Sequence, residues 1–181
     1  MRVTVTSDHV LDAFAQVSDD PSFAESRALV ERGRMPVEML QAMSLQPQIL
    51  QAFAGCGAVY PGGWLDRPLK ERVILESSKT NACQFCTNSH IALMKQLGIA
   101  DDPVASLTDM GLSDRERLAL EYTRAAMRDS NRIPEALFAD LKATFTDPEI
   151  VELTFLIGFI NMLNMFNNCL QVTYNDDYET P

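Results

Sequence analysis

The chain has 181 residues, 46% of them hydrophobic, and a formal net charge of −10. A chain of this length buries about two-thirds of the surface of its unfolded form, so it can fold as one domain without disulfides or a structural metal. The negative charge argues against nucleic acid and anionic membranes as partners, because both attract positively charged surfaces.

The first residues, MRVTVTSDHVLDAF, lack the continuous apolar run that a secretory signal peptide requires, so we expect a cytoplasmic protein. In a reducing compartment, a close cysteine pair in a chain with few cysteines indicates metal or redox chemistry rather than a disulfide scaffold. Cys83 and Cys86 form such a pair. Cys56 and Cys169 lie in apolar helical contexts, and we expect both to be buried packing residues.

Helical signals dominate the chain, and no alternation typical of a β-strand persists beyond a few residues. Prolines, glycines and two capping boxes, Ser113 with Glu116 and Thr146 with Glu149, mark the ends of the expected segments. The sequence therefore predicts an all-α fold. The patterns predict helices over 7–17, 21–33, 36–43, 47–60, about 68–82, about 83–97, 114–129, 134–145 and 148–172.

The last of these helices is apolar on almost every side, and such a helix must be buried. Glutamates and asparagines interrupt it too often for a membrane span. We therefore expect it to lie partly in the core and partly in a subunit interface. Asn161, Asn164 and Asn168 recur along it, and they either line a polar pocket or bind across that interface. Trp64, which follows a Pro-Gly-Gly breaker, is expected to close the core.

The segment from Lys70 to Gly98 carries the clearest chemical pattern of the chain. If Cys83 begins a helix, unpaired backbone N–H groups and the positive helix end favour its thiolate, which is the reactive form. Cys86 then lies one turn into the helix, and His90 follows on the same face at i+4, where it can exchange a proton with a thiol. Two cysteines at this spacing can also close a disulfide.

A carboxylate on the preceding helix could orient His90 if the two helices form an antiparallel hairpin. Glu71 and Glu76 both satisfy that requirement, and periodicity does not choose between them. Two other interpretations of the cysteines stay open. A C-x-x-C pair with one histidine can be half of a zinc site, although no second ligand pair is present, and both cysteines can be ordinary core residues.

The spacing E-x11-C-x-x-C-x3-H resembles the active-site signature of the carboxymuconolactone decarboxylase / AhpD-like alkylhydroperoxidase family. Glu71, Cys83, Cys86 and His90 match that pattern, and Ser78 and Asn81 also fall on positions that the family commonly fills in this way. The core of the resemblance covers about 64–128. The apolar last helix is similar to that of longer peroxidase-related members, so we expect residues 1–181 to form a single domain of this kind.

The resemblance implies an AhpD-like helical bundle that assembles as a homo-oligomer, as a dimer, trimer or hexamer. It also implies an alkylhydroperoxidase of the peroxiredoxin type. In this scheme Cys86 is the peroxidatic thiol, Cys83 is the resolving thiol, and Glu71 with His90 forms the proton relay. A hydroperoxide is the substrate, an external dithiol, either a protein or a lipoyl-type compound, is the reductant, and no cofactor or metal is required.

Two positions depart from the family pattern. Phe85 stands where some peroxidases of the family have a second histidine, so a relay through that residue cannot operate, whereas the redox couple stays intact. Ala82 replaces a frequent glycine, a change that is harmless if the residue is helical. Two alternative functions stay open: a thiol-regulated binding module without catalysis, and a small-molecule lyase or isomerase that uses Glu71 and His90 as an acid–base pair.

Overall fold

The computed structural model describes residues 1–17, 20–57, 59–60, 62–108 and 110–174. The described residues form α-helices and two short 3-10 helices, and they contain no β-strand. This confirms the all-α fold predicted from the sequence. The predicted helix boundaries agree with the observed ones to within a few residues, because local capping residues set most of them.

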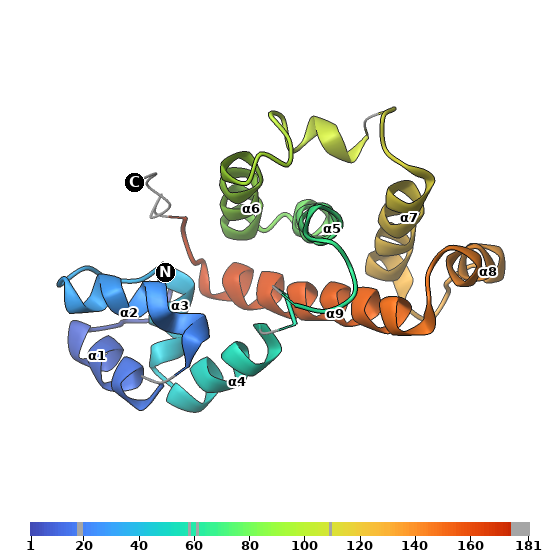
Figure 1. The fold of residues 1–181 in the computed structure, drawn as a ribbon. Helices are drawn as coiled ribbons and strands as arrows, with labels where there is room; N and C mark the ends of the chain where they lie inside the picture. Colours follow the sequence, from blue (N-terminus) through green and yellow to red (C-terminus); the bar gives the residue numbers. More distant parts are fainter. Residues whose placement is uncertain (18–19, 58, 61, 109, 175–181) are drawn as a thin grey trace.

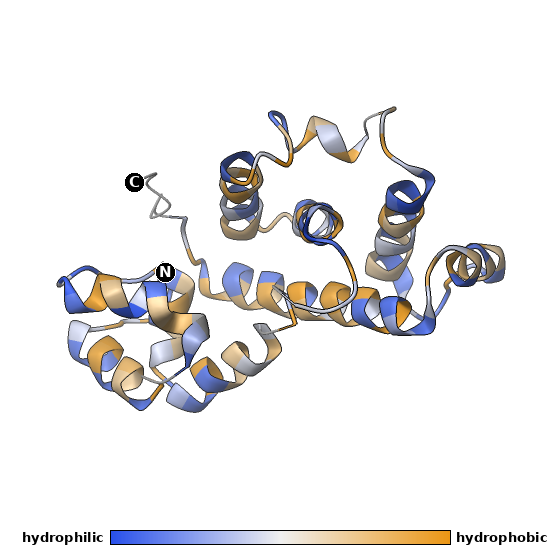
Figure 2. Cartoon of the chain, viewed as in Figure 1, coloured by the Kyte–Doolittle hydropathy of each residue, from blue (hydrophilic) through white to orange (hydrophobic). Residues whose placement is uncertain are grey.

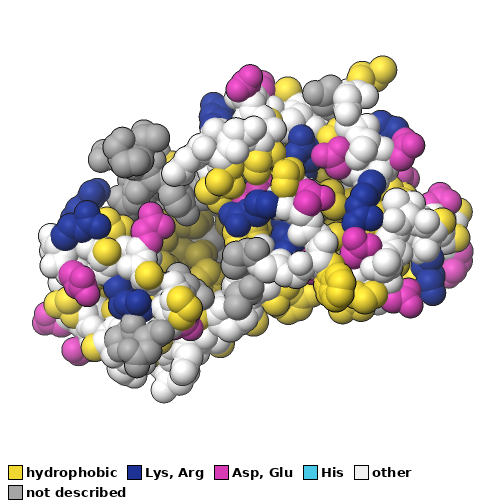
Figure 3. All heavy atoms as spheres, in the orientation of Figure 1, with side chains coloured by type: hydrophobic (Ala, Val, Ile, Leu, Met, Phe, Trp, Pro, Cys, Tyr) yellow, Lys and Arg dark blue, Asp and Glu magenta, His cyan; other side chains and the backbone are white. Residues whose placement is uncertain are grey.

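The first third of the chain forms a group of short helices beside one end of the last helix, as Figure 1 shows. Phe14, Phe23 and Phe53 contribute aromatic contacts to the core of this group. Figure 3 shows a hollow between this group and the rest of the molecule, with hydrophobic side chains at its floor. The elements are α1 (Ser7–Gln16), η1 (Pro21–Phe23), α2 (Ala24–Glu31), α3 (Glu38–Ser44) and α4 (Pro47–Gly57).

The rest of the chain is organised around α5, which contacts α6, α7 and α9 (Figure 1). Asp66 caps α5 by accepting a hydrogen bond from the backbone N–H of Leu69, and the two predicted capping boxes begin α7 and α9. The elements are α5 (Arg67–Thr80), α6 (Gln84–Gln96), η2 (Ala105–Leu107), α7 (Asp114–Asp129), α8 (Glu135–Thr144) and α9 (Asp147–Leu170).

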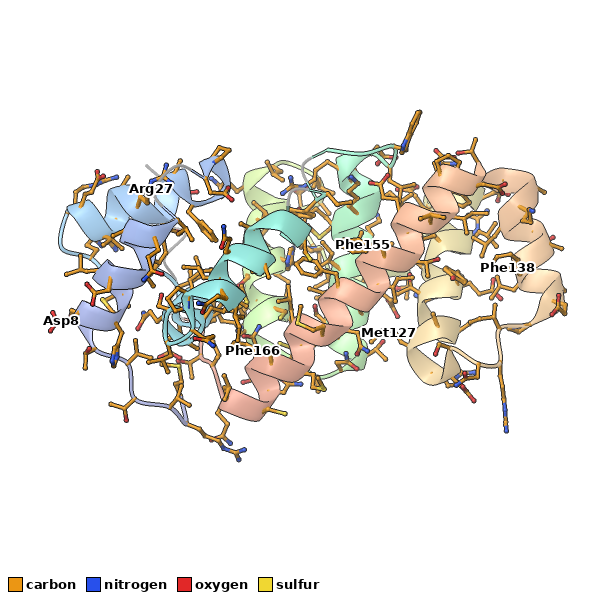
Figure 4. The ribbon with its side chains drawn as sticks, turned by 90° about the horizontal axis from the view of Figure 1, so that it is seen from below. Asp8, Arg27, Met127, Phe138, Phe155 and Phe166 are labelled. Atoms are coloured by element: carbon orange, nitrogen blue, oxygen red, sulfur yellow. The ribbon has the colours of Figure 1, made fainter. Side chains whose placement is uncertain are left out.

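Helix α9 has one buried and one exposed face. Its buried face includes Leu153, Ile157 and Ile160 in the main core, and Figure 2 shows hydrophobic residues recurring along the whole helix. Its length and apolar composition would suffice to cross a membrane, but a core helix of a soluble protein meets the same criteria. The opposite face, seen from below in Figure 4, leaves four apolar side chains exposed: Val151, Phe155, Met162 and Met165.

A buried ion pair joins α5 to α9. The Lys70 Nζ atom lies 2.5 Å from Glu152 Oε1, and both side chains are almost completely buried. The other Glu152 oxygen accepts hydrogen bonds from the backbone N–H groups of Trp64 and Leu65. The pair therefore fixes the segment before α5 as well as the two helices.

The structure corrects several expectations. Cys169 is exposed and Cys56 is half-buried, so neither is a fully buried packing residue. The Trp64 side chain is 74% exposed and does not close the core, because the segment is held through its backbone instead. Ala82 is not helical: it lies between α5 and α6 with a φ of 50°. A residue with a side chain adopts this left-handed backbone conformation at a cost of roughly 1–2 kcal/mol, whereas glycine does not pay it, which explains why glycine suits the position.

The Lys70–Glu152 pair generates a prediction about stability. Replacing Lys70 by Met leaves the Glu152 carboxylate buried without its counter-charge, and we expect a loss of about 3–5 kcal/mol in the free energy of unfolding. Denaturant unfolding followed by circular dichroism measures this loss. Arg132→Met, which breaks an exposed pair with Asp129, is the control and should cost less than about 1 kcal/mol. Equal effects of the two substitutions would contradict the role given to the buried pair.

Candidate active site

The residues of the predicted motif lie on a helical hairpin formed by α5 and α6. A turn through Asn81 and Ala82 reverses the chain, and the backbone N–H of Cys83 donates to the carbonyl of Ser78 across this turn. Cys83 is the N-cap of α6. The hairpin therefore brings a residue near the start of α5 beside a residue in the middle of α6, although 19 positions separate Glu71 from His90 in the sequence.

The two cysteine sulfurs form a close pair at the beginning of α6. Both cysteines are free, their Sγ atoms lie 2.9 Å apart, and both side chains are buried. The backbone N–H of Cys86 points at Cys83 Sγ at 3.4 Å, so the first sulfur occupies the position that an N-cap oxygen usually takes. The structure thus places a sulfur at the positive end of the helix, as the sequence predicts.

The local environment shifts the pKa values of the two thiols in opposite directions. The hydrogen bond from the Cys86 thiol, followed by that from its backbone N–H, outweighs burial and lowers the pKa of Cys83 to about 7. The same contact with Cys83, together with burial, raises the pKa of Cys86. The pair consequently titrates as a unit that holds one proton between two sulfurs, with Cys83 as the favoured thiolate.

Glu71 orients the imidazole of His90. The Nδ1 atom of His90 lies 2.7 Å from Oε2 of Glu71, whose carboxylate is fully buried. A histidine that donates from Nδ1 carries the lone pair of the neutral ring on Nε2, so Nε2 is the basic atom. Glu76, the competing candidate, pairs with Arg124 at 2.7 Å instead. The hairpin geometry therefore selects Glu71 as the partner of His90.

Two further residues hold the same carboxylate. Oε1 of Glu71 accepts hydrogen bonds from the Tyr60 hydroxyl and from Arg67 Nε, and the Arg67 guanidinium also stacks on the Tyr60 ring. Burial alone would raise the pKa of Glu71, but the hydrogen bonds from His90, Tyr60 and Arg67 outweigh it and lower the pKa below its usual value. Burial and the adjacent Glu71 charge raise the pKa of Tyr60, so Tyr60 stays protonated as a donor. Glu71 is therefore a fixed anion.

The polar residues of α9 reach the turn between the two helices. Asn81 donates to the side-chain oxygens of Asn161 and Asn164, and Asn168 donates to the backbone carbonyl of Asn81. These three asparagines therefore bind within the chain, and Asn168 also lines a cavity. The structure adds a residue that sequence analysis did not single out: Asn167, almost fully buried, donates to Cys86 Sγ at 3.2 Å.

The structure brings all four predicted site residues to the same hairpin. His90 makes no direct hydrogen bond to either sulfur among the described residues, and it lies one turn beyond Cys86 on α6. Among the residues that the structure describes, no group of three or more His, Cys, Asp or Glu side chains could hold a metal ion. Phe85 packs in the apolar cluster around the cysteines and contacts the Tyr174 ring edge-on.

Three residues of the site escaped sequence analysis: Tyr60, Arg67 and Asn167. Arg67 could have been found, because it precedes Glu71 by four positions on one helix face. Tyr60 comes from a segment before the helix and Asn167 from a helix more than 80 positions later, so no local pattern reveals them.

A helical protein with a C-x-x-C dithiol beside a glutamate–histidine pair is the class that this fold and site define. Residues 47–128 match the carboxymuconolactone decarboxylase family. The uncharacterized protein YnjA of Escherichia coli (strain K12) is 31% identical over 121 residues, which cover 61% of this chain and 66% of that protein.

Solved structures share the fold over most of the chain. The structure described as the alkylhydroperoxidase AhpD core of an uncharacterized peroxidase-related protein from Ralstonia eutropha JMP134 has a TM-score of 0.74 at 20% identity, covering 97% of this chain and 93% of that one. The debrominase Bmp8, solved with 2,3,4-tribromopyrrole, has a TM-score of 0.69 at 20% identity and covers 88% of each chain. Residues 47–128 thus carry the match to the carboxymuconolactone decarboxylase family, and the solved structures add a likeness in fold over most of the chain.

The lowered pKa of Cys83 generates a prediction about thiol reactivity. In a variant with Cys56 and Cys169 replaced by Ser, alkylation by iodoacetamide should follow a thiolate with a pKa of about 7. The rate should therefore be high above that pH and fall as the pH drops below it. Cys86→Ala removes the largest cause of the lowering, so the midpoint should rise toward the usual value of about 8.5. An unshifted midpoint in the parent protein would contradict the described pairing of the sulfurs.

Asn167 generates a second prediction. Asn167→Leu keeps the approximate volume but removes the N–H donor to Cys86, which helps to lower the pKa of both thiols. We expect the alkylation midpoint to move to higher pH. Asn161→Ala is the matched control on the same helix, because its side chain contacts only Asn81 among the described residues. The assignment fails if both variants shift the midpoint equally.

Proposed function

We propose that this protein is a cysteine-based alkylhydroperoxidase that cycles between a Cys83–Cys86 dithiol and a disulfide. The observation that carries the proposal is the pair of free sulfurs 2.9 Å apart at the start of α6, with a glutamate-held imidazole one turn further on. The family match over residues 47–128 and the fold agree with an enzyme of this kind. The structural neighbours at 20% identity share the fold, so the activity rests on the residues of this chain.

The first step is an attack of the Cys86 thiolate on the terminal oxygen of a hydroperoxide. A bond forms between sulfur and that oxygen, the O–O bond breaks, and the remainder leaves as an alkoxide. His90 Nε2 takes the proton from the Cys86 thiol beforehand and returns it to the alkoxide, which departs as an alcohol. Cys86 is then a sulfenic acid, and the hydroperoxide has accepted two electrons.

The second step closes the disulfide. The Cys83 thiolate attacks the sulfenic sulfur of Cys86, a sulfur–sulfur bond forms, and hydroxide leaves and is protonated to water. The sulfurs already touch, so small side-chain movements suffice. An external dithiol then reduces the disulfide by two exchange reactions and becomes a disulfide itself. This cycle requires neither flavin nor haem.

The distribution of the single shared proton decides which sulfur reacts first. With the proton on Cys83, Cys86 is the thiolate and the Asn167 N–H stabilises it. With the proton on Cys86, Cys83 is the thiolate, and the lowered pKa of Cys83 favours this form at rest. In the proposed cycle His90 takes the proton of the Cys86 thiol in the first step, so Cys83 stays a thiolate for the second. We assign Cys86 as the peroxidatic thiol because His90 follows it by one turn.

The proposed partners are a hydroperoxide, an external dithiol reductant and other copies of the chain, in the cytoplasm. The exposed apolar side chains of α9, which include Phe155 and Met162, support contact between subunits, because exposed apolar stripes on helices often mark interfaces. A homo-oligomer of this kind would cover these side chains without using the α9 face that holds the asparagines.

A second candidate function is that of a lyase or isomerase. The hydrogen-bonded Glu71–His90 pair favours it, because an oriented imidazole is an acid–base catalyst in its own right. In that case both cysteines are dispensable. The double variant Cys83→Ser/Cys86→Ser separates the two candidates, since it removes the sulfur chemistry and keeps the acid–base pair.

Substitutions in the motif test the proposed cycle with dithiothreitol as reductant. Cys86→Ser should abolish consumption of tert-butyl hydroperoxide, whereas Glu71→Gln and His90→Ala should lower kcat/KM by about 10²–10⁴-fold, the usual contribution of acid–base catalysis. Cys83→Ser should accumulate a sulfenic acid on Cys86, which dimedone labelling and mass spectrometry detect. A sulfenic acid trapped on Cys83 in the Cys86→Ser variant would reverse the two roles. Full turnover without Cys86 would exclude the cycle.

A further inference from the structure

A cavity of about 950 Å³ lies where the end of α5, the start of α6 and the end of α9 come together (Figure 1). Its volume falls in the range of about 300–1,000 Å³ that small-molecule sites occupy. Its lining includes Gln84, Thr87 and Asn88, which follow one face of the first turns of α6, and the segment from Gln171 to Thr173. The cavity is separate from the Glu71–His90 pair, neither of which lines it.

Two residues connect this cavity to the sulfurs. Asn167 lines the cavity and donates from Nδ2 to Cys86 Sγ, while its buried Oδ1 has no hydrogen-bond partner among the described residues. Val172 also lines the cavity and packs in the apolar cluster that contains Cys83 and Cys86. A ligand in the cavity is therefore one side-chain layer away from the dithiol, and Asn167 presents it with a free acceptor.

The charge around the cavity is unusual for this chain. The chain carries a net charge of −10, yet no acidic side chain occurs among the described lining residues. Lys79, in the last turn of α5, is the single charged side chain in that lining, and it forms no ion pair within the described residues. The first backbone N–H groups of α6 add the positive end of a helix of 13 residues. The cavity therefore attracts anions.

From these features we infer that the cavity receives a small organic hydroperoxide that bears a carboxylate, with Lys79 as its counter-charge. The inference deepens the proposed peroxidase function and rests on it. The carboxylate lies toward Lys79 and the start of α6, and the hydroperoxide group lies toward Asn167, whose free oxygen accepts its O–H. The terminal oxygen is thereby held against Asn167, the side chain that contacts the Cys86 sulfur.

Alkylation of the reduced protein tests the anion preference without any peroxidase activity. The same thiolate attacks iodoacetate and iodoacetamide and displaces iodide from each. The two reagents differ in charge, so the ratio of their rate constants reports the local potential. In the background that lacks Cys56 and Cys169, Lys79→Glu should lower the iodoacetate-to-iodoacetamide ratio by about fivefold, as expected for a nearby charge reversal in water. An unchanged ratio would overturn the inference.

Lys95→Glu is the matched control. It makes the same change in net charge on an exposed residue at the far end of α6, about 16 Å along the helix from Gln84. The control should leave the ratio within about twofold, because exposed charges beyond a Debye length of roughly 8–10 Å are screened. Equal effects of the two lysine substitutions would assign the preference to overall charge and overturn the site.

Turnover then tests the substrate class. With dithiothreitol as reductant, cumene hydroperoxide is compared with the same molecule carrying a para carboxylate. Lys79→Glu should lower kcat/KM for the carboxylate by about fivefold and leave the neutral substrate unchanged. Equal losses on both substrates would overturn the inference. If neither substrate is consumed while the alkylation ratio still responds to Lys79, the peroxidase proposal and this substrate fail, and only the anion preference of the cavity is retained.

Discussion

The buried carboxylate of Glu71 is the constraint on which the candidate site depends. Removing a carboxylate from water costs several kcal/mol unless counter-charges and hydrogen bonds offset the loss. Here His90, Tyr60 and Arg67 occupy its two oxygens. Breaking any one of these contacts would leave the buried Glu71 carboxylate with one hydrogen-bond partner fewer and no water to replace it. The orientation of the His90 ring is therefore as rigid as α5, which is itself packed against three other helices.

Much of this site is local in sequence, and that is why it could be predicted. Cys83, Cys86 and His90 lie within eight positions on one helix, and the hairpin that adds Glu71 is the simplest connection between two neighbouring helices. The choice of Glu71 over Glu76 depends on the rotation of α5 relative to α6. That rotation follows from packing against α7 and α9, where Glu76 meets Arg124, and it is not encoded in either helix alone.

The failed predictions share another physical origin. Ala82 lies just past the end of α5 and Trp64 lies before its start, so at both positions the backbone lies outside the helix although the residue type gives no sign of it. At Trp64 the backbone N–H, bound by Glu152, holds the segment, so the largest side chain nearby is free to face solvent. Asn167 was missed because its asparagine neighbours on α9 share its residue type, and only the fold decides which of them contacts a sulfur.

The residues of the motif and the residues that line the neighbouring cavity come from different parts of the chain. The dithiol, the histidine and the glutamate lie within residues 47–128, the segment that matches the family, whereas Asn167, Asn168 and Val172 lie beyond it. Both sulfurs are nearly inaccessible to solvent, and of that second group Asn167 donates to Cys86 while Val172 packs in the cluster that holds both cysteines. Proteins that share the hairpin and differ at the end of α9 should therefore keep the redox couple while accepting different ligands. In the proposed cycle the motif supplies the reaction, and the end of α9 with the lysine of α5 is the part of the chain proposed to select the molecule on which it acts.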